Sequence, residues 1–210
     1  MKRGLLLSLL LCTAPVHAQT PDLLTGGDYA RAFDSAQADG DPLTASRAAA
    51  AMAEYRAGGR GWITRAVSAA RQAVTTRPTS PDTHLALGSA LGLQARAGGF
   101  TLGALNSAQQ ARAALDRADI QAVLAEWHAG AWTKAGVFSG GNASRARTLA
   151  AAARHAPDNL FVQAHAGLGL ALLRDPQARL LLNRAAALEA RTALDRDLQA
   201  QARRALRELH

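Results

Sequence analysis

Pairs of glycines, and prolines that follow a helix-capping residue, divide this chain into alanine-rich segments of similar length. These break points are Gly58-Gly59, Gly98-Gly99, Gly140-Gly141, Asp41-Pro42, Ser80-Pro81 and Asp175-Pro176. Between them, leucines recur among the alanines at three- and four-residue spacing, which is the period of an amphipathic helix. β-Branched residues are few, and no stretch alternates apolar and polar residues over the length of a strand. The pattern therefore predicts an all-α fold.

About ten helices are predicted, because capping residues and prolines mark helix starts and glycines mark helix ends. Their expected ranges are 28–38, 43–57, 62–76, 82–96, 103–116, 119–135, 143–155, 160–173, 177–190 and 192–208.

The connection after the helix over 62–76 and that after 143–155 share one pattern. In both, an alanine is followed five residues later by a proline, then by a short turn and a helix in which a glycine follows leucine or alanine. The matching residues are Ala73, Pro78, Leu87-Gly88 and Leu91 in one case, and Ala152, Pro157, Ala166-Gly167 and Leu170 in the other. This pattern resembles the junction between two tetratricopeptide repeats. His84 and Leu91 stand where that family usually has aromatic residues.

The resemblance covers residues 28–190; it is strongest over 66–91 and 149–185 and weakest over 103–135. It implies antiparallel helix pairs stacked into a right-handed, TPR-like solenoid. We expect one domain over 28–210, with a polar C-terminal capping helix at about 192–209. Residues 19–27 are expected to form a flexible N-terminal segment.

The stretch 135–142, AGVFSGGN, raises the alternative of a phosphate-binding loop. Such a loop would follow a strand and carry Gly-Lys-Ser/Thr, and neither feature is present here. The same glycine pair recurs at 58–59 and 98–99, between the two helices of a predicted pair. A turn between helices is the prediction, because glycine ends a helix in the left-handed conformation without a Cβ penalty.

The N-terminus has the pattern of a cleaved secretory signal peptide over residues 1–18. Lys2 and Arg3 precede a short apolar run, and small residues lead to a cut after Ala18. Cys12, the only cysteine, lies within that segment, but Leu11 before it disfavours a lipoprotein signal. Export to the periplasm or the extracellular space is predicted, without a transmembrane anchor.

Residues 19–210 contain 22 basic and 16 acidic side chains, so an anionic partner is one interpretation of the charge. The arginines are scattered and interleaved with acids, however, and no clustered basic face with stacking aromatics is visible. We therefore expect a protein or peptide partner in the cell envelope and no nucleic acid.

Candidate chemistry is sparse. His84, His128 and His165 fall on the first helices of three successive pairs, but no helix carries two ligands at metal-binding spacing, and a shared zinc is not predicted. The chain has only four glutamates, at 54, 126, 189 and 208, and no Ser/His/Asp order or carboxylate pair stands out. No cofactor, no metal and no enzymatic activity are predicted.

The resemblance implies a concave groove lined by the first helix of each pair. Together with the polar and aromatic stretch around Trp127, it gives these groove candidates: Asp82, Leu85, Ser89, Leu93, Glu126, Trp127, Lys134, Phe161 and Leu168. Most of these residues are apolar or small, which suits a hydrophobic or helical peptide segment. Trp127 and Trp132 either pack in the core or line a pocket.

Two functions follow. The first is a non-catalytic interaction scaffold that binds a peptide or helical segment of an envelope partner. The alternative is a small-molecule-binding accessory subunit of an envelope transport system.

Overall fold

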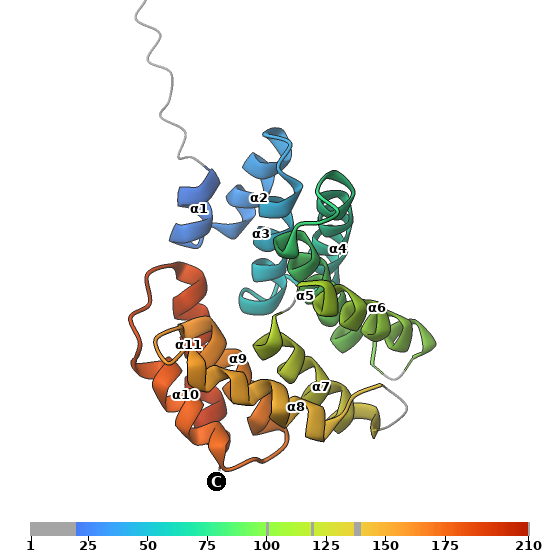
Figure 1. Ribbon diagram of the computed structural model, residues 1–210. Coiled ribbons are helices and arrows are strands. Elements are labelled where there is room, and N and C mark those ends of the chain that lie inside the picture. The colour runs from blue at the N-terminus through green and yellow to red at the C-terminus, as the bar shows by residue number, and fades with distance from the viewer. Residues whose placement is uncertain (1–19, 100, 119, 137–139, 210) are drawn as a thin grey trace, which may run out of the picture.

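The computed structural model describes residues 20–99, 101–118, 120–136 and 140–209. The predicted signal peptide therefore lies outside the described residues. Within the described part every regular element is helical, as the periodicity predicts (Figure 1). The elements are α1 (Thr20–Gly26), α2 (Tyr29–Ala38), α3 (Pro42–Tyr55), α4 (Gly59–Thr76), α5 (Pro81–Ala97), α6 (Leu102–Ala118), α7 (Gln121–Ala135), α8 (Ala143–Ala150), the 3-10 helix η2 (Ala151–His155), α9 (Leu160–Leu172), α10 (Gln177–Ala187) and α11 (Ala193–Glu208).

The predicted cap at Asp41 is confirmed, whereas the side chain of Ser80 makes no capping hydrogen bond at the start of α5. Asp41 accepts hydrogen bonds from the backbone N–H groups of Leu43 and Thr44, and Pro42 occupies the first helical position of α3. Thr192 and Asp195 form a reciprocal capping box at the start of α11. At the predicted turns, Gly59, Gly99 and Gly140 have positive φ, which glycine adopts without a Cβ penalty. Residues 137–139 of the stretch 135–142 lie outside the described residues.

The N-terminal segment 19–27 differs from the prediction, because it contains helix α1 where a flexible segment was expected. Leu23 of α1 is buried against Ala32 and Ala48, and the Thr20 hydroxyl donates to the carboxylate of Asp39. These tertiary contacts with α2 and α3 stabilise the short helix, which its local helix propensity alone would not do.

The helices pack as neighbouring pairs: α3 with α4, α5 with α6, α7 with α8, and α9 with α10. Two of these pairs use the same device. A Cβ on Gly88 would lie 2.5 Å from Cγ of Leu115, and a Cβ on Gly167 would lie 2.9 Å from Cγ of Leu182. Each glycine of a first helix therefore receives a leucine of the second helix, so the two junctions found in the sequence are also equivalent in packing.

Buried side chains join successive pairs. The Gln163 amide of α9 donates to the carbonyls of Ala153 and Ala156, and the His84 ring of α5 lies 2.7 Å from the carbonyl of Pro78. Gln199 of α11 donates to the carbonyl of Ala185 at the end of α10. The free carbonyls that end a helix are thereby satisfied from the helix that follows.

The array curves, and its last helix contacts its first: α11 packs on α10 and α9 and also meets α1. In Figure 1, α3, α5, α7, α9 and α11 surround the middle of the molecule, whereas α4 and α6 lie at the right edge of the view and α8 and α10 at its lower side. We call the side facing the middle the inner face. The helix α11, predicted as a terminal cap, thus also closes the array.

Two halves can be distinguished, α1–α6 and α7–α11. Their backbones come close mainly where α6 meets α7 and where α1 meets α11. No helix in the described part of the chain is both long enough and apolar enough to span a bilayer.

Candidate functional site

Five helices each contribute one polar side chain to a chain of contacts on the inner face. Glu54 ends α3 and forms an ion pair with Arg96, which ends α5. Gln201 of α11 donates to the other oxygen of Glu54 over 3.2 Å. Nδ1 of His165, in α9, lies 2.6 Å from Oε2 of Glu126, in α7. We call these five residues, with Tyr55 beside Glu54, the inner cluster.

A glycine brings Glu126 onto His165. Gly169 lies one turn after His165 on α9, so both residues share a face of that helix. A Cβ at Gly169 would lie 2.9 Å from both N and Cα of Glu126. The backbones of α7 and α9 therefore approach closely at this point, and only glycine leaves room for that approach.

The carboxylate of Glu126 is ionised at neutral pH despite its surroundings. Burial favours the neutral acid, but the hydrogen bond with His165 and the charges of His165 and Arg96 outweigh burial and lower the pKa of Glu126. Arg96 thus acts on two carboxylates, pairing directly with Glu54 and favouring the charged form of Glu126.

Tyr55 is the hydroxyl group of the cluster. Burial, followed by the charges of Glu54, Glu126 and Asp197, raises the pKa of Tyr55. Its hydroxyl therefore stays protonated and is available as a hydrogen-bond donor among three carboxylates.

A second set of contacts joins the two ends of the array. The Tyr29 hydroxyl donates to Oδ2 of Asp197 over 2.6 Å, and Nη1 of Arg56 lies 2.9 Å from Oδ1 of the same carboxylate. The Arg56 guanidinium also lies 5.0 Å from the centre of the Tyr29 ring. We call Tyr29, Arg56 and Asp197 the polar seam. Beneath it, Tyr29 packs with Ala51 of α3 and Ala193 of α11.

The halves meet differently at the other end of the inner face. Large apolar side chains of α5, α6, α7 and α9 form one cluster there, which we call the apolar seam: Leu85, Leu115, Val123, Leu124 and Phe161. Trp127 also packs against it. Leu115, Val123 and Leu124 are buried, so this contact excludes water.

The predicted groove residues separate into four environments. Glu126 joins the inner cluster, whereas Leu85, Trp127 and Phe161 meet at the apolar seam. Leu93 and Leu168 are buried. Ser89 is half-buried, and Asp82 and Lys134 are exposed, with Asp82 paired to Arg47 over 2.8 Å.

The predicted groove residues therefore do not lie together on one surface. The repeat register selects residues on the first helices, but the polar side chains that converge come from helix ends and from α11. Glu54, Tyr55, Arg96, His165 and Gln201 were missed as a group. The available signal was the scarcity of glutamate, since two of the four glutamates in the chain lie in the inner cluster.

The three histidines have separate surroundings: His84 contacts the carbonyl of Pro78, and His165 contacts Glu126. His128 is 1% exposed, and neither of its ring nitrogens has a hydrogen-bond partner in the described part of the chain. Burial, with the charges of Arg112 and Arg145, lowers the pKa of His128 to about 4, so the ring is neutral at pH 7. Among the described residues, no three potential metal ligands converge.

Two surface cavities lie outside the inner face. One, of about 340 Å³, is lined by Gln109, Arg112, Ala113, Asp116, Trp127 and Gly140. Trp127 therefore both packs against the apolar seam and lines this cavity, which is open to the surface and contains charged groups.

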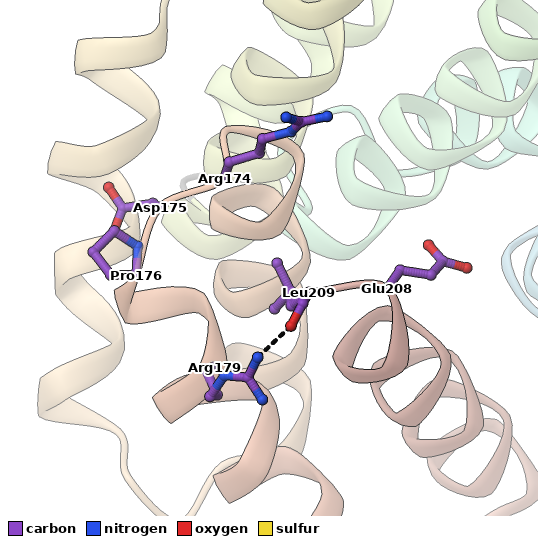
Figure 2. A pocket seen from close by; sticks show the side chains of 6 residues that line it. All are labelled: Arg174, Asp175, Pro176, Arg179, Glu208 and Leu209. Atoms are coloured by element: carbon purple, nitrogen blue, oxygen red, sulfur yellow. Dashed lines mark hydrogen bonds between the residues drawn. The ribbon is translucent and has the colours of Figure 1, made fainter.

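The other cavity, of about 350 Å³, lies between the α9–α10 turn and the end of α11 (Figure 2). Figure 2 shows that Arg179 points to the carbonyl of Leu209, to which it donates a hydrogen bond, whereas Arg174 and Glu208 extend away from that contact. The side chains of this cavity do not converge on a common point. The inner cluster is the stronger candidate site, because its polar groups do converge.

Comparison of the chain with protein-family models, with curated proteins and with solved structures finds no match.

Proposed function

We propose that this protein is a non-catalytic interaction scaffold, exported through its N-terminal signal peptide, that binds a peptide or helical segment of a cell-envelope partner on its inner face. The observation that supports it is the convergence of one polar side chain from each of five helices. We further propose that the helix pairs are of the TPR type and stack with that family's right-handed twist. The equivalent packing of Gly88 and Gly167 supports this assignment.

The inner face offers a partner both signs of charge. The side chain of Arg96 is 49% exposed, and those of Glu54, Glu126 and His165 are about one-fifth exposed. Such groups can exchange an internal ion pair for one with a partner, and Tyr55 adds a hydroxyl donor. A peptide backbone with charged side chains suits this surface better than the purely apolar segment that the sequence favours.

The experiment uses two glycines that differ in location. Gly92 lies one turn before Arg96 on α5, and a Cβ there would meet no heavy atom within 4 Å. Gly61, on α4, has the same free space and is exposed. A photo-crosslinking phenylalanine analogue at Gly92 is expected to capture a defined envelope protein in the native organism, whereas the analogue at Gly61 captures none.

The inner cluster supplies the variant that decides the outcome. Arg96→Glu should abolish the crosslink from Gly92, because it reverses the charge beside the label and removes the ion pair with Glu54. Arg71→Glu on α4 is the matched control, since Arg71 is also exposed. Equal capture from both glycines, or capture unaffected by Arg96→Glu, would overturn the proposal. Charge substitutions at Leu85 or Phe161 would test folding instead, because both belong to the apolar seam.

A small-molecule-binding accessory subunit is the second candidate. The cavity beside Trp127 supports it, because an indole ring, Arg112 and Gln109 could bind a planar polar molecule. Trp127→Leu should then abolish ligand-induced stabilisation in a thermal-shift screen of small metabolites, while Trp132→Leu should not. A screen without any hit that depends on Trp127 would reject this candidate.

A further inference from the structure

We propose that the apolar seam is a pivot and the polar seam a clasp, so that the two halves open and close around the inner cluster. This inference rests on the proposed function, since it describes how a partner would reach that site. It follows from the contrasting chemistry of the two regions where the backbones of the described halves mainly meet.

The polar seam depends on one carboxylate. Asp197 accepts from both Tyr29 and Arg56, and these two bonds, together with that from Gln201 to Glu54, join side chains of α11 to the N-terminal half. The side chain of Arg56 is 40% exposed, so water can replace its bond with Asp197 at modest cost. Of the apolar groups beneath, Ala51 and Ala193 are small, and the larger Leu24, Met52 and Leu194 packed against them are only partly buried, so they hold the ends together less firmly than a buried leucine cluster would.

The apolar seam cannot part in the same way. Leu115, Val123 and Leu124 are buried, and separating them would expose large apolar side chains that water cannot satisfy. The connection between α6 and α7 lies at this seam, so the chain itself also holds the halves together there. Opening therefore turns the C-terminal half about the apolar seam and lengthens the distance across the polar seam.

The inner cluster is arranged for such a movement. Glu126 and His165 both belong to the C-terminal half, and Glu54 and Arg96 both belong to the N-terminal half. Across the two halves, the described residues of the cluster are joined by the hydrogen bond between Glu54 and Gln201 and by the longer-range attraction of Arg96 for Glu126. The halves can thus separate with both strong pairs intact, so each half presents its own charges to an entering segment.

The test measures distances between spin labels in the full chain, with Cys12 replaced by serine so that only introduced cysteines are labelled. One pair, Gln37→Cys and Arg204→Cys, spans the polar seam from exposed positions on α2 and α11. The matched pair, Gln110→Cys and Ser144→Cys, spans the region of the apolar seam from exposed positions on α6 and α8. Each pair is measured with and without Asp197→Asn by pulsed electron paramagnetic resonance.

Asp197→Asn should lengthen and broaden the distance between labels at 37 and 204 and leave the distance between 110 and 144 unchanged. High salt should do the same in the parent chain, because it screens the Arg56–Asp197 pair. Unchanged distances at both seams, or equal changes at both, would overturn the proposal. No partner is needed for these measurements, so the proposal of a pivot is tested independently of the crosslinking result.

Circular dichroism of every labelled variant identifies any that has unfolded. Glu189→Gln provides a charge-matched control, because its pair with Arg191 is highly exposed and involves no residue of either seam. It should leave both distances unchanged, and a change as large as that of Asp197→Asn would also count against the clasp.

Discussion

The two seams perform the same task with different physical chemistry. At the apolar seam, Leu115, Val123 and Leu124 join the halves by excluding water. At the polar seam, the carboxylate of Asp197 accepts hydrogen bonds from the Tyr29 phenol and the Arg56 guanidinium. Beneath these bonds lie the buried Ala51 and Ala193. The comparison teaches that an array of similar helix pairs need not be uniform in strength.

The largest effect is expected at the apolar seam. Leu115→Ala removes a fully buried side chain that both fills the space beside Gly88 and contacts α7. We expect a loss of about 2–5 kcal/mol in the free energy of unfolding, as for other buried leucines. Urea denaturation followed by circular dichroism measures it. An effect smaller than that of any substitution in the polar seam would reverse the ranking of the seams.

Acid should weaken the molecule next to the apolar seam through His128. The pKa of His128 is about 4 in the folded protein and 6.5 in the unfolded chain. Between these pH values the unfolded chain therefore binds a proton that the folded protein does not. Stability is therefore complete above pH 6.5 and falls as the pH drops toward 4, by roughly 1.4 kcal/mol for each unit. Urea midpoints measured from pH 7.5 to 4.5 test this prediction.

His128→Leu should remove that pH dependence, because the variant lacks the imidazole ring that the unfolded chain protonates. It should also cost little at pH 7, because the two unpartnered ring nitrogens disappear with the histidine. His155→Gln, at an exposed position, is the control and should keep the parent slope. A His128→Leu variant with an unchanged slope would show that another group causes the acid sensitivity.

A contact inside the C-terminal half serves as the reference for both seams. Gly169→Ala forces α7 away from α9, and we expect a loss of about 1–3 kcal/mol from overpacking against backbone atoms of Glu126. Gly92→Ala, on α5, meets open space and should stabilise by about 0.5–1 kcal/mol through helix propensity. Thermal unfolding of the two variants distinguishes them by sign, and equal effects would contradict the close approach at Gly169.

The smallest loss of stability is expected at the polar seam. Asp197→Asn keeps an acceptor for Tyr29 but loses the charge that pairs with Arg56, so the unfolding free energy should fall by about 1–2 kcal/mol. The loss should shrink in high salt, because screening already weakens the pair in the parent chain. Denaturant midpoints at two salt concentrations provide the measurement. A loss that does not change with salt would mean that the contact is not electrostatic.

Local signals predicted the helices well. Asp41-Pro42, the glycine pairs and the alanine periodicity act within a few residues, so they can be recognised in a single sequence. The equivalence of Gly88 and Gly167 was visible for the same reason. Helix α1 was not predicted, because the contacts of Leu23 and Thr20 that stabilise it come from α2, α3 and Asp39.

The candidate site was largely hidden because its bonds join distant parts of the chain. Glu54 and Arg96 are 42 residues apart, Glu126 and His165 are 39 apart, and Glu54 and Gln201 are 147 apart. No spacing rule connects such residues. The stretch 103–135, where the repeat pattern is weakest, also includes the α6–α7 junction between the halves.

The contact of α11 with α1 has a consequence for how this protein can change over evolution. Open helical arrays gain or lose copies readily, because each added pair only needs a neighbour on either side. Here an added pair would carry Asp197 away from Tyr29 and Arg56 and leave both ends without a partner. Closure therefore fixes the copy number, and change is confined to substitution within the existing pairs.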